Sequence, residues 1–352
     1  MTASDSASAS QRWRVRVAFA AIYTIWGSTY LAIRFAIETM PPFLMGSARY
    51  LIAGAILYAL TRRQRVAPIT RIHWRSAFII GGLLLLGGNG GVIWAEQVIP
   101  SGLAALIIAT VPLWMALLNW LRGDNVRPNL GVTLGLGLGL FGIVLLVSPG
   151  QAAGGDNANP LGVLVLVLAA LSWSIGSLYS RKARLPSEPL VATAMEMLAG
   201  GALLLVAGLL SGEAGQIRLD QVSPRSLLAL GYLIVFGSLL GFSAYIWLLR
   251  VSTPARVSTY AFVNPVVAVF LGWTLAGESL TPRTLIAAAV IVTAVVLIVA
   301  NQIRSTPQPT GDAAPIEDRE SGPRRIVAQI ESRPSAERIF QRFRHDGQAG
   351  SA

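Results

Sequence analysis

The chain has no cysteine among its 352 residues, which excludes disulfide bonds and thiolate metal sites. It has only two histidines, His73 and His345, and both lie in charged stretches. Charged residues make up 13% of the chain, well below the roughly 25% of soluble domains. Apolar runs of 18 or more residues recur instead, which is typical of membrane-spanning helices. The composition therefore predicts an all-α integral membrane protein.

The net charge of +11 could by itself indicate a nucleic-acid-binding protein. The basic residues, however, gather in the short links between apolar runs, as the positive-inside rule describes. With the N-terminus in the cytoplasm, the inner side holds 15 Lys and Arg residues and the outer links hold 4. We therefore predict cytoplasmic N- and C-termini and no nucleic-acid partner.

Ten membrane spans can be placed, and the links between them are too short for a soluble domain. A cytoplasmic segment (1–14) precedes a first unit of five spans (15–149). A periplasmic linker (150–160) leads to a second unit (161–301) and a cytoplasmic tail (302–352) whose composition predicts disorder. The predicted spans are 15–36, 43–61, 76–97, 101–121, 130–148, 161–180, 190–211, 225–248, 256–276 and 283–301.

The second unit repeats markers of the first at a nearly constant distance, which is the sign of a duplication. Because each unit holds five spans, an odd number, the second must cross the membrane in the opposite direction. We predict ten transmembrane helices in two inverted five-helix repeats, a plan that places a substrate site between the halves of secondary transporters. The matching pairs are Pro100 with Pro254, Pro112 with Pro265, Asp124 with Glu278 and Pro128 with Pro282, at separations of 154, 153, 154 and 154 residues.

Several stretches resemble a known family. Trp26-Gly-Ser-Thr-Tyr-Leu-Ala-Ile-Arg34, Pro41-Pro-Phe43 and the run 49–54 are similar to the opening of the EamA family of the drug/metabolite transporter superfamily. The runs 94–102 and 109–113 are similar to its YedA-like exporters. The resemblance covers residues 15–300. It implies a ten-helix inverted-repeat bundle in the bacterial inner membrane that exports amino acids, metabolites or drugs by alternating access, without a cofactor.

Two charged residues are expected inside the bundle, where a charge is costly and tends to serve function. Arg49 lies about two turns into the second span, and Glu196 occupies the equivalent place in the seventh. We hypothesise that Arg49 attracts a carboxylate and that Glu196 attracts an amine or a proton. A structural pair, or an Arg49 side chain that reaches the outer surface, would explain the same pattern.

A third acid, Glu96, lies near the outer end of the third span, beyond the glycine-rich stretch 87–91 that contains Asn89. Such a stretch lets a helix bend or another backbone approach closely. A protonatable acid at a gate suits a proton-coupled exchanger. The alternative is an interfacial carboxylate in contact with water.

Two proline segments are predicted to flex beside the cavity. Pro265 removes a hydrogen bond inside the ninth span, next to Asn264 and one turn after Tyr260. Thr110 and Pro112 form the counterpart in the fourth span. A static kink that only helps packing is the alternative.

Aromatic residues form a stripe on the first span, at Tyr23, Trp26 and Tyr30, and Trp173 is the counterpart on the sixth. This stripe could stack a flat or cationic substrate, or it could simply pack.

The sequence predicts a transporter rather than an enzyme, with a small-molecule substrate, the lipid bilayer and protons as partners, as a monomer or homodimer. A polytopic membrane enzyme and an uptake permease or channel are the alternatives. No span holds a histidine or acids at metal-ligand spacing, so we predict no metal site.

Overall fold

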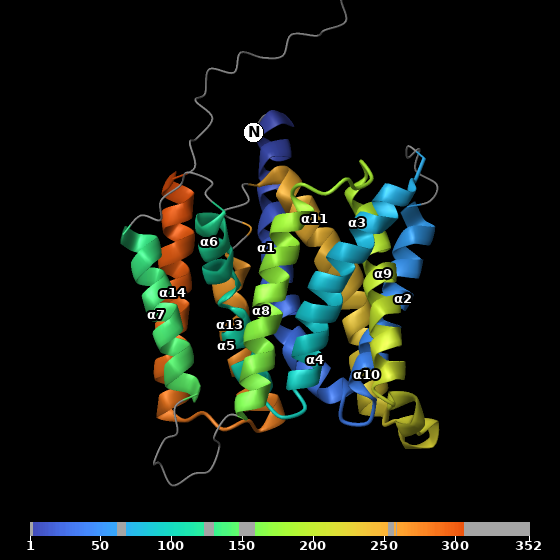
Figure 1. Ribbon diagram of the computed structural model, residues 1–352. Helices are drawn as coiled ribbons and strands as arrows, with labels where there is room; N and C mark the ends of the chain where they lie inside the picture. Colours follow the sequence, from blue (N-terminus) through green and yellow to red (C-terminus); the bar gives the residue numbers. More distant parts are fainter. Residues whose placement is uncertain are drawn as a thin grey trace, which may run out of the picture. The chain divides into compact units, whose positions relative to one another are not determined.

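The computed structural model describes residues 3–61, 68–122, 130–147, 159–252, 257 and 259–305. Every regular element in these ranges is a helix (Figure 1). The all-α class predicted from composition is therefore confirmed for the described part of the chain. Asp124, Pro128, Pro254, most of the 150–160 linker and nearly all of the predicted tail lie outside the described residues.

The third, fourth and eighth predicted spans are each built from more than one helix. Two of the pieces, η1 and η4, are π-helices, and they stand in the middle of the third and eighth spans. The helices are α1 (Ala3–Ala36), α2 (Pro42–Thr61), α3 (Arg71–Gly81), η1 (Gly82–Gly90), α4 (Gly91–Ala95), α5 (Ser101–Ile108), α6 (Val111–Leu121), α7 (Leu130–Val147), α8 (Pro160–Ser180), α9 (Pro189–Leu210), η2 (Glu213–Gln216), η3 (Leu219–Gln221), α10 (Pro224–Tyr232), η4 (Leu233–Leu240), α11 (Gly241–Val251), α13 (Tyr260–Ala276) and α14 (Pro282–Ser305).

Among the described residues, seven helical segments are long and apolar enough to cross a membrane, while Leu130–Leu145 and Tyr260–Ala276 are apolar but shorter. With α1, which belongs to neither group, a helix stands at each of the ten predicted positions. The seven are Pro42–Thr61, Arg71–Ala95, Ser101–Leu121, Pro160–Ser180, Pro189–Leu210, Pro224–Leu248 and Pro282–Asn301.

Proline marks where many of these helices begin. α2, α8, α9, α10 and α14 each start with one, because the first helical residue needs no backbone N–H and its φ suits proline. Asn159 adds a side-chain cap to α8, accepting from the backbone N–H groups of Leu161 (3.0 Å) and Gly162 (3.4 Å). α1 differs from expectation: it begins at Ala3 and continues through residues 3–14, because neither glycine nor proline occurs before Gly27.

The helices pack in pairs that are distant in sequence. α2 lies along α9, α7 along α14, and α1 along α13 (Figure 1). α8 packs on η1 and α6, while α1 also packs on α10 and α11. The largest buried cluster lies between these pairs and includes Ile93, Ile107, Leu166 and Ile298.

The outward faces of the bundle are apolar as well. On α7, Leu134, Phe141 and Val144 are exposed, as are Leu164 and Leu168 on α8. A helix that is apolar on all sides suits a surrounding of lipid rather than water. These faces agree with a bundle whose surface meets acyl chains.

Candidate functional site

Residues 26–29 of α1 make contacts that hold α1 to the second half of the chain. The indole Nε1 of Trp26 donates a hydrogen bond to the carbonyl of Gly237 in η4 (3.2 Å). Ser28 Oγ and the Tyr232 hydroxyl are 2.7 Å apart. At Gly27 a Cβ would lie 2.6 Å from that of Val267, so only glycine permits this crossing of α1 and α13. The motif thus fixes α1 against α10, η4 and α13.

Arg49 of α2 is buried at the same place, with 3% of its surface exposed. Its Nε donates to Ser238 Oγ of η4 (3.0 Å). Its Nη1 is buried and has no hydrogen-bond partner among the described residues. The alternative that the Arg49 side chain reaches the outer surface is therefore wrong. A buried donor without a partner costs free energy, so Nη1 is a candidate group for binding an anion.

Three aromatic rings surround the indole of Trp26. Trp26 packs at 5.5 Å from Phe242, 5.2 Å from Tyr245 and 5.1 Å from Tyr260, measured between ring centroids. Tyr245 and Tyr260 stand edge to face at 6.0 Å. The predicted stripe on α1 divides: Tyr23 bonds to the hydroxyl of Thr259, and Tyr30 packs against the main core. The aromatic group therefore joins α1, α11 and α13 rather than one helix face.

Pro265 lies inside α13, which continues through it. The neighbouring Asn264 is buried, and its amide, turned to donate, faces the carbonyls of Tyr23 (3.3 Å) and Tyr260 (3.2 Å). Asn264 thus ties α13 to α1 beside Trp26. In a membrane, such side chains satisfy backbone groups that a proline or a crossing helix leaves open.

The counterpart at Pro112 has a different geometry from the expected mid-helix kink. α5 ends at Ile108, and a new helix, α6, begins at Val111 with Pro112 in its first turn. Thr110 in the break is buried, donates to the Ile107 carbonyl (2.6 Å) and accepts from Trp114 Nε1 (3.2 Å). Pro112 therefore stands in the first turn of a helix, a place that favours proline, whereas Pro265 stands inside one.

Asn89 and Trp173 both contact residues of the π-helix η1. Asn89 Nδ2 donates to the Leu84 carbonyl (3.4 Å), one of the carbonyls inside the π-helix. Ser172 Oγ of α8 donates to the Leu83 carbonyl (2.8 Å), and the Trp173 ring lies against Gly88. Both π-helices therefore lie against a tryptophan from another helix, Trp173 at η1 and Trp26 at η4. π-bulges are frequent at functional sites.

Glu96 follows α4 directly, and its side chain is completely buried. Neither carboxyl oxygen has a hydrogen-bond partner among the described residues, whereas the backbone carbonyl accepts from Arg34 Nη1 (2.5 Å). The alternative of an interfacial carboxylate in water is therefore wrong. Arg34, Arg49 and Glu278 are the charged groups that act on it electrostatically.

Two other acids cap helices that are far away in sequence. Glu278 accepts from Ser101 N (2.7 Å), Ser101 Oγ (2.7 Å) and Gly102 N (3.0 Å) at the start of α5. The chain reaches this position because Gly277, with φ of 65°, ends α13 in the left-handed conformation. Glu213 accepts from Phe43 N (3.1 Å) and Leu44 N (2.9 Å) in α2. The Gly-acid pair predicted as a repeat marker is, at residue 278, a helix cap.

Glu196 stands apart from this set. In the contact between α2 and α9, Leu51 lies beside Gly201 and Leu44 beside Gly208, so the helices are antiparallel. This register separates Arg49 and Glu196 by about seven residues, or ~10 Å along the axis. The two therefore do not meet as the suggested pair.

Sequence reasoning missed several residues of this region. Ser238, Phe242 and Tyr245 become part of it only through the packing of η4 and α11 on α1. Their types are ordinary in a membrane helix, and only the predicted repeat, in which the eighth span would be the counterpart of the third, could have pointed to them. Within the described residues no group of three or more His, Cys, Asp or Glu could hold a metal ion.

Comparison with known proteins gives consistent results. The model of the EamA-like transporter family matches residues 15–148 and again 160–300. The "Uncharacterized inner membrane transporter YedA" of Escherichia coli K12 is 42% identical over 282 residues, covering 79% of this chain and 88% of that protein. The "Probable amino-acid metabolite efflux pump" of the same strain is 24% identical over 77% of this chain and 90% of its own length. A crystal structure with 23% identity shares the fold, with a TM-score of 0.57 over 83% of this chain and 99% of its own.

Proposed function

The chain belongs to the EamA-like transporter family of the drug/metabolite transporter superfamily, and we propose that it exports small molecules carrying an anionic group. It is a multi-pass membrane transporter, and the names of its family and relatives point away from an enzyme. Amino acids are the first class to test, because one relative is named as an amino-acid metabolite efflux pump.

Arg49 carries this proposal. Its guanidinium is buried, held in place by Ser238 through Nε, and keeps Nη1 free of any described partner. A carboxylate or phosphate is the natural partner for such a donor. The rings around Trp26 stand on the same helices and suit an apolar or aromatic body on the substrate.

The inverted repeat is the frame that we propose for alternating access. The family model matches the chain twice, and the two π-helices occupy the third and eighth spans, which are equivalent positions. The contacts between helices follow the same symmetry when each span is matched with its counterpart in the other unit. The contact of α1 with α13 corresponds to that of α8 with α6, and the contact of α3 with α9 corresponds to that of η4 with α2. Such symmetry supports a substrate site between the halves.

The end of the bundle that holds Glu96 is joined by many polar links. Arg225 pairs with Glu38 (3.4 Å) and lies 3.6 Å from the centroid of the Phe35 ring, and Ser226 Oγ donates to the Phe35 carbonyl (2.7 Å). The positive-inside bias supports the proposal that this end is periplasmic and that both termini are cytoplasmic. The links support a conformation closed to the outside.

Glu96 is the group that we assign to proton coupling. It is completely buried, and its carboxyl oxygens have no hydrogen-bond partner among the described residues. Taking up a proton would remove the cost of an unpaired buried charge, so protonation and opening of the outer end would be linked.

The test begins with a metabolite survey of media from cells that overproduce the wild type, Arg49→Leu or Arg49→Lys at equal membrane levels. We expect anionic metabolites to accumulate in the medium with the wild type and to be absent with Arg49→Leu. They should be reduced with Arg49→Lys, because lysine keeps the positive charge but lacks the planar guanidinium that can bind a carboxylate through two N–H groups. Normal export by Arg49→Leu would overturn the assignment.

The compound found in the medium is then used, radiolabelled, in proteoliposomes with and without a pH gradient. Saturable counterflow and gradient-driven accumulation are expected of an exporter. Accumulation by intact cells would instead favour an uptake permease, and unsaturable flow that no gradient drives would favour a channel.

A further inference from the structure

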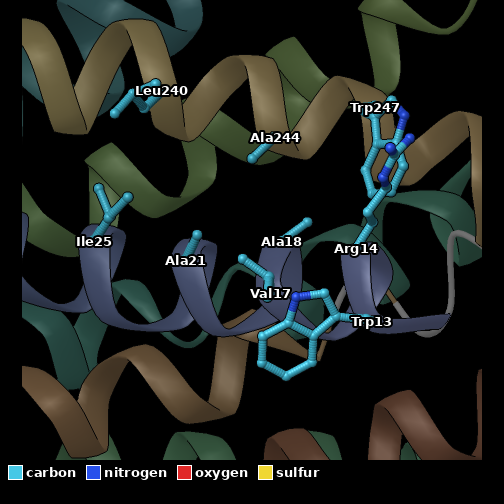
Figure 2. Close-up of a pocket in the computed structure, with 9 residues that line it drawn as sticks. All are labelled: Trp13, Arg14, Val17, Ala18, Ala21, Ile25, Leu240, Ala244 and Trp247. Atoms are coloured by element: carbon cyan, nitrogen blue, oxygen red, sulfur yellow. The ribbon is translucent and has the colours of Figure 1, made fainter. Parts of the chain in front are cut away.

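A groove separates α1 from α11 at the surface of the bundle, with a volume of about 440 Å³. This size lies within the range of about 300–1,000 Å³ that ligand pockets have. Figure 2 shows its floor, where Ala18 and Ala21 of α1 face Ala244 of α11. Small side chains on both helices leave this space open.

The groove opens sideways, away from the centre of the bundle. Val17 on one rim is 45% exposed and Leu240 on the other is 49% exposed. The outward faces of the neighbouring helices are apolar too. In a membrane this opening meets acyl chains, so the surface predicts an apolar occupant that enters from the bilayer.

One end of the groove is polar. Arg14 is the single charged residue in its lining, and Figure 2 shows its side chain leaving α1 toward Trp247 of α11. Trp13 also lines this end and is 67% exposed. Tryptophan and arginine together mark the depth of the lipid headgroups, because both place an apolar part inward and a polar part outward.

We propose that this groove binds one acyl chain of an anionic phospholipid, with the lipid phosphate on Arg14. The chain would lie along Ala18, Ala21 and Ala244, and the charge of the headgroup would complement the guanidinium. Under the orientation proposed above, the lipid belongs to the cytoplasmic leaflet. On the same two helices Trp26 packs against Phe242 and Tyr245, so the lipid would also set the spacing of α1 and α11 beside the substrate site.

Arg12 provides a matched control. It is exposed on α1 two residues before Arg14 and does not line the groove. Two residues correspond to about 200° around a helix, so the two arginines point in nearly opposite directions. Arg12→Gln and Arg14→Gln therefore remove the same charge at the same depth, and only one of them touches the proposed site.

The experiment measures quenching of tryptophan fluorescence in nanodiscs whose phosphatidylglycerol or phosphatidylethanolamine carries brominated acyl chains. The fluorescence of Trp247 is obtained by subtracting the fluorescence of the Trp247→Phe variant from that of the same protein with Trp247 in place. We expect brominated phosphatidylglycerol to quench Trp247 at a mole fraction about fivefold lower than brominated phosphatidylethanolamine. This ratio is the equivalent of about 1 kcal/mol for one basic residue near a membrane surface. Arg14→Gln should remove the preference, and Arg12→Gln should keep it.

A second variant tests the groove itself. Ala244→Phe, accepted only if it elutes as the wild type in size-exclusion chromatography, should reduce quenching by both lipids because it fills the floor. Equal quenching by the two lipids in the wild type, or equal effects of the two arginine variants, would overturn the proposal. Either result would indicate that only ordinary boundary lipid contacts the groove. Nanodiscs expose both leaflets and the measurement needs no transport, so its outcome is independent of the proposed export and orientation.

Discussion

Three acids at one end of the bundle have very different surroundings. Glu213 and Glu278 each accept hydrogen bonds from two backbone N–H groups at the start of a distant helix. Glu96 is completely buried, and its carboxyl oxygens have no partner in the described part of the chain. Glu213 and Glu278 therefore act as structural links between distant helices. The carboxyl of Glu96 forms no such link with the described residues.

The physical difference lies in the positive end of a helix. A helix N-terminus offers unpaired N–H donors and a favourable dipole to an anion. Glu213 and Glu278 use both and connect α2 and α5 to residues 170 and 177 positions away. Glu96 follows the C-terminal end of α4, where the dipole disfavours negative charge. A buried acid at a helix C-terminus is unfavourable for stability, so a role in coupling explains its presence better than a structural one.

The largest expected effect is on transport. Glu96→Gln should reduce proton-driven export in proteoliposomes by at least about tenfold, because an amide takes up no proton in this range. Its melting temperature should not fall below that of the wild type, since no hydrogen bond of the carboxyl is lost and an unfavourable buried acid is removed. A variant that loses stability but still exports against a gradient would place Glu96 with the capping acids.

Glu278→Ala should show the opposite behaviour, with a large loss of stability. Three donors at the start of α5 lose their acceptor, which should cost about 2–4 kcal/mol. Thermal unfolding of the detergent-solubilised protein, followed by size-exclusion chromatography, measures this loss. Asp220→Ala removes an exposed acid on a link between helices and should change stability by less than about 0.5 kcal/mol.

Glu213→Ala should destabilise by a smaller amount. Two backbone donors of α2 are affected, and the cost of losing a cap is about 1–2 kcal/mol. The same unfolding assay applies. A loss larger than that of Glu278→Ala would show that the number of donors does not decide the strength of these links.

Arg225→Ala should have the smallest effect. Its ion pair with Glu38 has both side chains partly exposed, at 52% and 37%, and such pairs contribute about 0–1 kcal/mol. The loss should shrink further in high salt, because salt screens exposed charges. An effect that salt leaves unchanged would point to the stacking on Phe35 instead.

The positions of the helices could be predicted from the sequence because hydropathy and proline are local signals. α2, α8, α9 and α14 begin within one residue of the predicted starts. The two π-helices could not, because both lie against a tryptophan from another helix, as Gly88 does against Trp173. The break at Thr110 could not either, because Pro112 and Pro265 look alike in the sequence although only Pro112 follows a break.

The residues of the candidate site could be predicted only in part, because some of them carry a local signal and others depend on how the helices pack. Arg49 and Trp26 are conspicuous as a buried charge and a member of a motif, and the structure brings both to η4. Glu213 escaped notice because an acid in a link is ordinary in sequence. Its role depends on reaching α2 across 170 residues. Glu196 was placed by symmetry with Arg49, yet the antiparallel register of α2 and α9 separates the two along the helices.

The two π-helices also set the direction in which later residues face. Their hydrogen bonds run from residue i to i+5, so each turn contains one residue more than an α-turn. The extra residue therefore rotates every later residue of the span by about 100° around the helix axis. Glu96 lies beyond η1 and Tyr245 beyond η4, so this offset bears on the direction in which both residues face. Deleting a single residue within Gly82–Gly90 would turn Glu96 away from Arg34 while leaving the span nearly as long.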